Sequence, residues 1–219
     1  MQMPDRESLT PMMQQYFDVK EKYMDCILLY RLGDFYEMFF DDALTASRVL
    51  DITLTGRNCG LEEKAPMCGV PFHAVDGYVA KLVANGYSAA ICEQAEDPAT
   101  AKGIVKREVI RVVTPGTIMD TSALDAEKNN YLCAVSASEN GAGAAFVDIT
   151  TGECSAIEFP HKDYEIDLLG ETAKYMPSEV LVNLRCMENT ALVDEIRDKT
   201  HGVVRNYYEW AFEPDEAQK

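Results

Sequence analysis

The segment Gly33-Asp34-Phe35-Tyr36-Glu37 holds the residues best suited to read another molecule. In an extended strand, side chains two positions apart point to the same face, so Phe35 and Glu37 should project together and Tyr36 should point the other way. An aromatic ring can insert between stacked bases and kink a duplex. A carboxyl group beside that ring can meet the edge of the displaced base. Because unstacking costs less at a mispaired base, the two side chains would sense the deformability of a duplex rather than a base code.

The Phe-x-Glu triplet alone is more typical of a core phenylalanine beside a solvated glutamate. The stretches around it are more specific, because they resemble, in family order, the mismatch-recognition domain of MutS-type DNA mismatch-repair proteins. The resemblance is dense over residues 8–120 and looser over residues 130–210, the connector domain of that family. It is carried by LYRLGDFYEMFFDDA (29–43), LTGR (54–57), PMCGVPFHA (66–74), YVAKL (78–82), ICEQ (91–94), DPAT (97–100) and RVVTPGT (111–117).

The resemblance implies roles for individual residues. In the family, the phenylalanine stacks on the mismatched base and the glutamate hydrogen-bonds to it, which are here Phe35 and Glu37. Possible contacts with the DNA backbone are Arg57, Met67, His73 and Arg107. For Met67 a place in the core, and for His73 a cap on the helix near Asp76, are open alternatives. Lys102, Lys106, Arg107 and Arg111 form the densest basic run, which suits either phosphate contact or an ordinary solvated face.

Hydrophobic periodicity predicts an α/β protein. In the first half we expect a helix from Thr10-Pro11 to about Met24, a helix capped by Asp41 or Asp42, and a helix capped by Asp76. Strands are predicted at 27–32, 35–39, 52–55, 88–93 and 108–113, with a long loop over 56–69. In the second half we expect strands at 131–136, 143–148, 153–159, 179–183 and 203–207, and helices at 163–176 and 190–199.

Turn signals divide the chain into two domains. We expect a mixed-sheet mismatch-recognition domain over residues 1–119, a linker over 120–128 and a connector domain over 129–219. Three adjacent strands followed by alternating helix and strand are the order of an RNase H-like fold, which indicates a fold and no activity.

The net charge of −17 argues against a general nucleic-acid binder, which carries a basic face. The charge is uneven along the chain. Residues 1–119 contain 12 Lys and Arg against 17 Asp and Glu, a net of −5, whereas residues 120–219 contain 8 against 20, a net of −12. Any DNA contact is therefore expected in the first half.

We interpret the chain as a fragment without enzymatic activity, because the GxxxxGK[ST] phosphate loop that holds ATP does not occur in the sequence. We expect no cofactor and no metal here, while the longer parent would be an ATPase that binds ATP and Mg²⁺. The expected partners are mismatched double-stranded DNA and, through the connector domain, a MutL-type protein. The parent is expected to be a homodimer and the fragment a monomer. Without an apolar run of about 18 residues or a signal peptide, a cytoplasmic, nucleoid-associated bacterial protein is expected, with no membrane contact.

Two other classes of protein, a nuclease and a protein-interaction module, are alternatives for this sequence. A nuclease would need several carboxylates around metal ions, and Asp148 is the first candidate ligand in the RNase H-like half. An interaction module would use the connector domain as a docking surface, with little DNA binding by the fragment. The seven cysteines have no CxxC spacing, so we expect free buried thiols; a metal site from Cys59, Cys68 and His73 is the minor alternative.

Overall fold

The computed structural model describes residues 6–96, 103–118 and 129–217, and its contacts divide the chain into two compact units between Thr114 and Pro115. We expected the first domain to extend to residue 119. Residues 115–118 instead belong to the second unit, where the Gly116 amide donates to Glu179 Oε2 at 3.0 Å. The expected linker, residues 120–128, lies outside the described residues.

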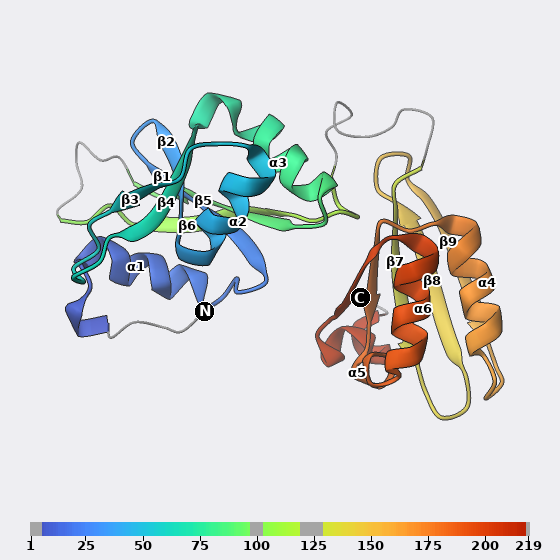
Figure 1. Ribbon diagram of the computed structural model, residues 1–219. Helices are drawn as coiled ribbons and strands as arrows, with labels where there is room; N and C mark the ends of the chain where they lie inside the picture. The colour runs from blue at the N-terminus through green and yellow to red at the C-terminus, as the bar shows by residue number, and fades with distance from the viewer. Residues whose placement is uncertain (1–5, 97–102, 119–128, 218–219) are drawn as a thin grey trace. The chain divides into compact units, whose positions relative to one another are not determined.

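The first unit is a six-stranded mixed sheet with helices on both faces (Figure 1). The strands lie in the order β3-β4-β2-β1-β5-β6. Strand β1 runs parallel to β5, and the other neighbouring strands are antiparallel. The elements are the 3-10 helix η1 (Arg6–Ser8), α1 (Pro11–Lys20), β1 (Cys26–Leu32), β2 (Phe35–Phe39), α2 (Phe40–Leu50), β3 (Thr55–Arg57), β4 (Ala65–Pro71), the 3-10 helix η2 (Phe72–Ala74), α3 (Val75–Ala84), β5 (Ser88–Gln94) and β6 (Arg107–Val113).

Helix α1 covers one face of this sheet, and α2 and α3 cover the other (Figure 1). Helix α1 starts with Pro11 at its first position, where the missing amide costs no hydrogen bond. It ends at Lys20, whereas we expected it to end near Met24. Its Tyr16 ring lies edge-on to Phe39 of β2, with 5.0 Å between ring centroids, and to Tyr30 of β1, at 5.5 Å. These buried aromatic contacts fix α1 over the end of β2 that Phe39 occupies.

A buried ion pair joins α1 to the start of α2. We expected Asp41 or Asp42 to cap α2, but the Asp42 carboxylate faces inward and accepts from Lys20 Nζ at 2.9 Å and from the Leu28 amide at 3.0 Å. The pairing of β1 with β2 stops before Leu28, so the carboxylate takes the place of the missing strand partner. Burial raises the pKa of Asp42, while Lys20 opposes this rise.

The second unit is a five-stranded sheet in the order β11-β10-β7-β8-β9. Strands β7, β8 and β9 are antiparallel, and β10 and β11 add in parallel on the other side of β7, which confirms the expected RNase H-like order. Helix α5 was not expected. The elements are β7 (Tyr131–Ala137), β8 (Ala142–Asp148), β9 (Glu153–Phe159), α4 (Glu165–Tyr175), β10 (Glu179–Val182), α5 (Leu184–Glu188), α6 (Thr190–Thr200), β11 (Val203–Asn206), the 3-10 helix η3 (Glu209–Phe212) and α7 (Pro214–Ala217).

The core of the second unit lies between this sheet and helices α4, α5 and α6. The rings of Phe146 on β8 and Tyr175 on α4 stack with 4.1 Å between centroids. Asn183 caps α5 by accepting from the Cys186 amide, and it also bonds both backbone groups of Ala137. Among the described helices of both units, none combines the length and the apolarity needed to cross a membrane.

Candidate nucleic-acid interface

Phe35 lies at the tip of the hairpin that joins β1 to β2. Leu32 pairs with Phe35, so Gly33 and Asp34 form a two-residue turn, and Gly33 has a φ of 60°, which glycine adopts without strain. The Phe35 side chain is 47% exposed, whereas Tyr36 is 4% exposed and points to the face covered by α2 and α3. The alternation predicted from the sequence is therefore confirmed: Phe35 and Glu37 share one face, and Tyr36 lies on the other.

Strand β4 supports both side chains at a position without a side chain of its own. Phe35 pairs with Pro71 and Glu37 pairs with Gly69. A Cβ atom at Gly69 would lie 3.5 Å from Glu37 Cγ and 3.8 Å from Phe35 Cδ1, so the ring and the carboxyl stem both lean over this glycine. A base that contacted Glu37 would therefore lie next to the Phe35 ring.

The structure brings Arg57 onto Glu37. Arg57 lies on β3, the edge strand beyond β4, and its Nη1 is 2.5 Å from Glu37 Oε2. The Glu37 side chain is 15% exposed and the Arg57 side chain 37% exposed. This pair was not predicted from the sequence, because residues 56–69 were expected to form a loop. Strand β4, which begins in that segment, pairs with both β3 and β2 and so brings Arg57 toward Glu37.

Behind Phe35, on the α2 and α3 face, four side chains lock the hairpin. The Tyr36 hydroxyl donates to Glu93 at 2.7 Å, and Arg31 lies 3.3 Å from the same carboxylate. The Arg31 guanidinium also stacks 3.9 Å from the centre of the Phe72 ring. Burial, followed by the Glu93 carboxylate, raises the pKa of Tyr36 to about 12, so its hydroxyl remains a donor at neutral pH. None of these roles was predicted, although the alternation of β1 places Arg31 on the Tyr36 face.

Of the two other predicted contact residues, Met67 lies on the face of Phe35, and His73 lies beside Phe72. Met67 of β4 is half-buried and pairs with Phe39 on one side and Thr55 on the other, so it shares the face of Phe35. His73 is exposed in η2, and its ring lies edge-on to Phe72 with 5.8 Å between centroids. Neither position tests the predicted backbone contacts, which stay predictions.

Comparison with known proteins gives a family for both units. The family model described as MutS domain I matches residues 10–122, and the one described as MutS domain II matches residues 130–219. The chain belongs to the MutS family. It is 58% identical over 206 residues to the DNA mismatch repair protein MutS of Ruminiclostridium cellulolyticum, which is 94% of this chain and 24% of that protein. It is 61% identical over 176 residues to MutS of Acetivibrio thermocellus, which is 80% of this chain and 20% of that protein. The chain thus spans about a quarter or less of the length of these curated relatives.

In this MutS-family chain, the structure does not support the expected role of Arg107. We expected it among the DNA-backbone contacts, but its residue is 8% exposed and its guanidinium is directed inward. Its Nε donates to the Arg31 carbonyl at 2.7 Å, and its Nη1 donates to Gln15 Oε1 at 3.0 Å. The side chain also lies over the Tyr30 ring, with 5.0 Å to the centroid. Arg107 therefore joins β6 to β1 and α1, and its charge is not presented to a ligand.

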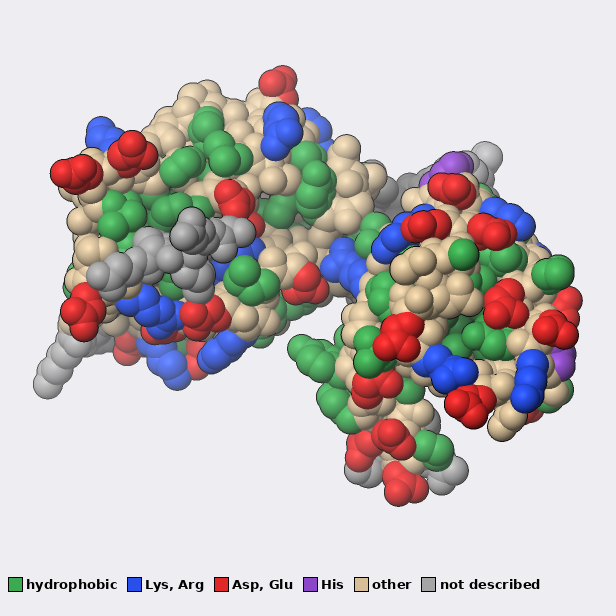
Figure 2. All heavy atoms as spheres, turned by 60° about the horizontal axis from the view of Figure 1, so that its bottom comes forward, with side chains coloured by type: hydrophobic (Ala, Val, Ile, Leu, Met, Phe, Trp, Pro, Cys, Tyr) green, Lys and Arg blue, Asp and Glu red, His purple; other side chains and the backbone are tan. Residues whose placement is uncertain are grey.

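The two other described residues of the basic run pair with acids. Lys106 lies 2.5 Å from Glu108, and Arg111 lies 3.4 Å from Asp76, while Lys102 and the DPAT motif at 97–100 lie outside the described residues. These exposed pairs fit the alternative of a solvated face. On the visible face of the second unit, acidic side chains are spread among fewer basic ones (Figure 2).

The second unit contains no arrangement suited to metal chemistry among its described residues. The buried Asp148 carboxylate accepts from Thr150 Oγ1 at 2.6 Å and from the amides of Thr150, Asn130 and Thr151. Although burial raises the pKa of Asp148, these hydrogen bonds together lower it. Asp148 thus holds the β8–β9 turn together, and its oxygens are already occupied by internal donors.

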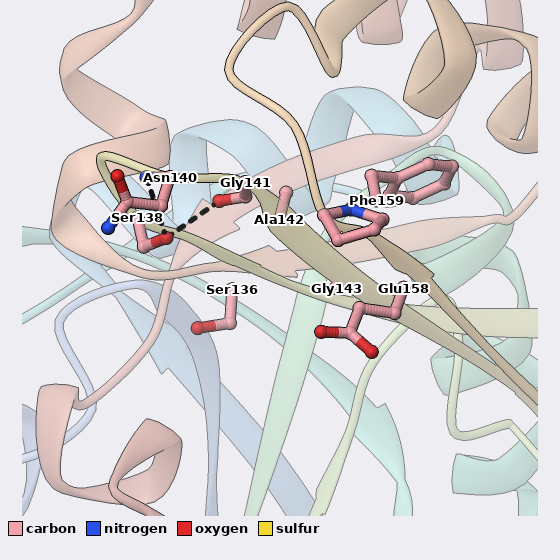
Figure 3. A pocket seen from close by; sticks show the side chains of 9 residues that line it. Ser136, Ser138, Asn140, Gly141, Ala142, Gly143, Glu158 and Phe159 are labelled. Atoms are coloured by element: carbon pink, nitrogen blue, oxygen red, sulfur yellow. Dashed lines mark hydrogen bonds between the residues drawn. The ribbon is translucent and has the colours of Figure 1, made fainter.

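An open depression of about 450 Å³ lies at the β7–β8 turn (Figure 3). Its hydroxyl and backbone groups bond to one another: Ser138 Oγ donates to the Gly141 carbonyl at 2.9 Å and accepts from the Asn140 amide at 3.3 Å. Glu158 is the charged residue in its lining. These polar groups stabilise the turn and do not converge on a ligand.

Proposed function

We propose that this chain reads mismatched or unpaired bases in duplex DNA as the first step of DNA mismatch repair. The observation that carries the proposal is the exposed Phe35 ring at the tip of the β1–β2 hairpin, with Glu37 on the same face. The curated relatives are named DNA mismatch repair proteins, which supports the same function.

The mechanism follows from the two side chains. Phe35 wedges into a base step, and unstacking costs a few kcal/mol, less where the bases are mispaired. Glu37 then hydrogen-bonds to the displaced base. Tyr36, Glu93 and Arg31 contact one another on the face of the hairpin opposite to Phe35. These contacts hold the hairpin in place while the Phe35 ring inserts.

The grip on DNA and the use of ATP belong to other parts of a longer protein. The sequence given has no phosphate loop for ATP, and the described residues hold no group of acids, histidines and cysteines arranged for a metal ion. The proposed steps use only Phe35 and Glu37. In a protein of the relatives' length, ATP binding and hydrolysis would respond to the reading made by Phe35 and Glu37. Such a protein would act as a homodimer.

The second unit favours a second role, because its half of the chain has a net charge of −12 and would be repelled by DNA. We propose that it connects the reading domain to the rest of the protein and provides the docking surface for a MutL-type partner. The measurement is the backbone NMR spectrum of the chain with and without a MutL-type protein. Shifts confined to residues 6–96 would contradict this role.

The test of mismatch reading uses the full-length protein and two duplexes that differ in one mispaired base. Wild type should bind the mismatched duplex more tightly, and Phe35→Ala should lose that preference while it keeps its affinity for the regular duplex. Tyr87→Ala, which removes a comparably exposed aromatic side chain between α3 and β5, is the matched control and should keep the preference. A Phe35→Ala protein that still prefers the mismatch would refute the proposal.

A further inference from the structure

The proposed function needs the Glu37 carboxylate to bond a base, and in the structure this carboxylate is paired with Arg57. To bond a base, a Glu37 oxygen must face outward beside the Phe35 ring. In the structure, Oε2 is directed across Gly69 to Arg57 at 2.5 Å. Because the ion pair holds the carboxylate toward β3, turning it outward to a base beside Phe35 weakens the pair.

The pair is built to open. Arg57 is 37% exposed, and it lies on β3, a three-residue strand at the edge of the sheet. Its guanidinium can swing into solvent without moving a buried element. Ion pairs at this exposure are weak, because water screens the charges and long side chains lose freedom when they pair. The Lys20–Asp42 pair is different, since both of its side chains are buried and its opening would disrupt the core.

The ion pair also lowers the electrostatic repulsion between Glu37 and the phosphates of a regular duplex. An unpaired carboxylate within about 10 Å of backbone phosphates is repelled, because screening at moderate salt is incomplete over that distance. With Arg57 bound to Glu37, the pair of side chains carries no net charge. A regular duplex can then lie against the face while Glu37 stays paired.

We propose that Arg57 is a latch on Glu37 and thereby a residue that sets mismatch specificity. The latch stays closed on a regular duplex and opens only when Glu37 turns to a base that Phe35 has displaced. This inference rests on the proposed function. It adds that the cost of opening falls on the mismatched complex alone, so the latch limits how strongly the mismatch is preferred.

The test is the ratio of the dissociation constants for regular and mismatched duplex, measured with the full-length protein. Arg57→Gln removes the charge and keeps the length of the side chain. It should raise the ratio by roughly two- to fivefold, because the mismatched complex no longer breaks a pair and the regular complex gains an unpaired carboxylate. Arg57→Lys keeps the charge and should leave the ratio close to that of wild type.

Two controls separate the latch from a plain phosphate contact. In a Glu37→Ala background, Arg57→Gln should leave the ratio unchanged, since there is no carboxylate to hold. Arg48→Gln removes an exposed positive charge from α2, on the opposite face of the sheet, and should also leave it unchanged. A thermal melt of each variant shows whether the fold is retained.

The outcomes distinguish the latch from the function on which it rests. A ratio that stays constant in Arg57→Gln would make Arg57 a contact common to both duplexes, and a ratio that falls would make it an aid to base reading; either result overturns the latch. If wild type prefers the mismatch and Phe35→Ala does not, the proposed function stands regardless. If wild type has no preference, both proposals fail.

Discussion

Phe35 and Phe39 are the same residue type on the same face of the same strand, yet one is 47% exposed and the other is fully buried. The difference comes from α1, whose Tyr16 covers Phe39 and leaves the hairpin end of β2 open. The exposed end therefore carries the residues proposed for reading DNA, and the covered end anchors them. A residue's role in this strand is set by a helix that lies far from it in the sequence.

The largest effect is expected on the free energy of unfolding when each of the two phenylalanines is replaced by alanine. Phe39→Ala should lower the free energy of unfolding by about 4 kcal/mol, because it leaves a cavity among Tyr16 and its neighbours. Phe35→Ala should change it by less than about 0.5 kcal/mol, because it removes an exposed ring. Urea denaturation of the two variants measures both values. Equal losses would mean that Phe35 is part of the core and that the two ends do not differ.

The next effect tests the anchor of the covered end. Lys20→Met should cost on the order of 3 kcal/mol at neutral pH, because it leaves the Asp42 carboxylate buried without its counter-charge. The pKa of Asp42 is already raised, so its protonation favours the folded state as the pH falls. The cost of Lys20→Met should therefore shrink when the pH is lowered from 7 toward 4.

The control for this prediction is Lys22→Met, which removes an exposed lysine from the turn after α1 and should cost little at either pH. Denaturation curves at the two pH values give the comparison. A cost for Lys20→Met that does not depend on pH would show that lost packing, and not the unpaired carboxylate, destabilises the variant.

The smallest effect concerns the back of the exposed end. Tyr36→Phe removes the hydrogen bond to Glu93 and should lower the free energy of unfolding by about 1 kcal/mol. Tyr87→Phe, at an exposed position, provides the baseline. Because Tyr36 steadies the hairpin, Tyr36→Phe should also reduce mismatch preference slightly in the full-length protein. If neither quantity moves, the hairpin is rigid without this contact.

The local patterns of the sequence carried much of the fold. The alternation of Phe35, Tyr36 and Glu37 was predicted because a strand has a period of two, and this needs no knowledge of distant residues. In the second unit, turn signals at Asn140-Gly141 and Thr151-Gly152 placed all three antiparallel strands within one residue of their observed bounds.

What the sequence did not reveal depends on contacts between distant segments. Strand β4 contains Pro66, Gly69 and Pro71, which individually disfavour a strand, and pairing with β2 and β3 on both sides overrides them. Without β4, Arg57 could not be placed beside Glu37. Arg107 was misjudged because a charge in a basic run suggests exposure, whereas here a carbonyl, an amide and an aromatic ring surround it.

The distribution of thiols gives the chain a ready site for chemical labelling. Six of the seven cysteines are buried, and only Cys154, on the edge strand β9, is exposed. Burial raises the pKa of Cys68 and Cys186 to about 11 and of Cys92 and Cys133 to about 12, which keeps these thiols protonated and unreactive at neutral pH. A maleimide dye should therefore attach at Cys154 in the native sequence. A fluorophore there would report on the second unit and would leave the residues proposed to read DNA unmodified.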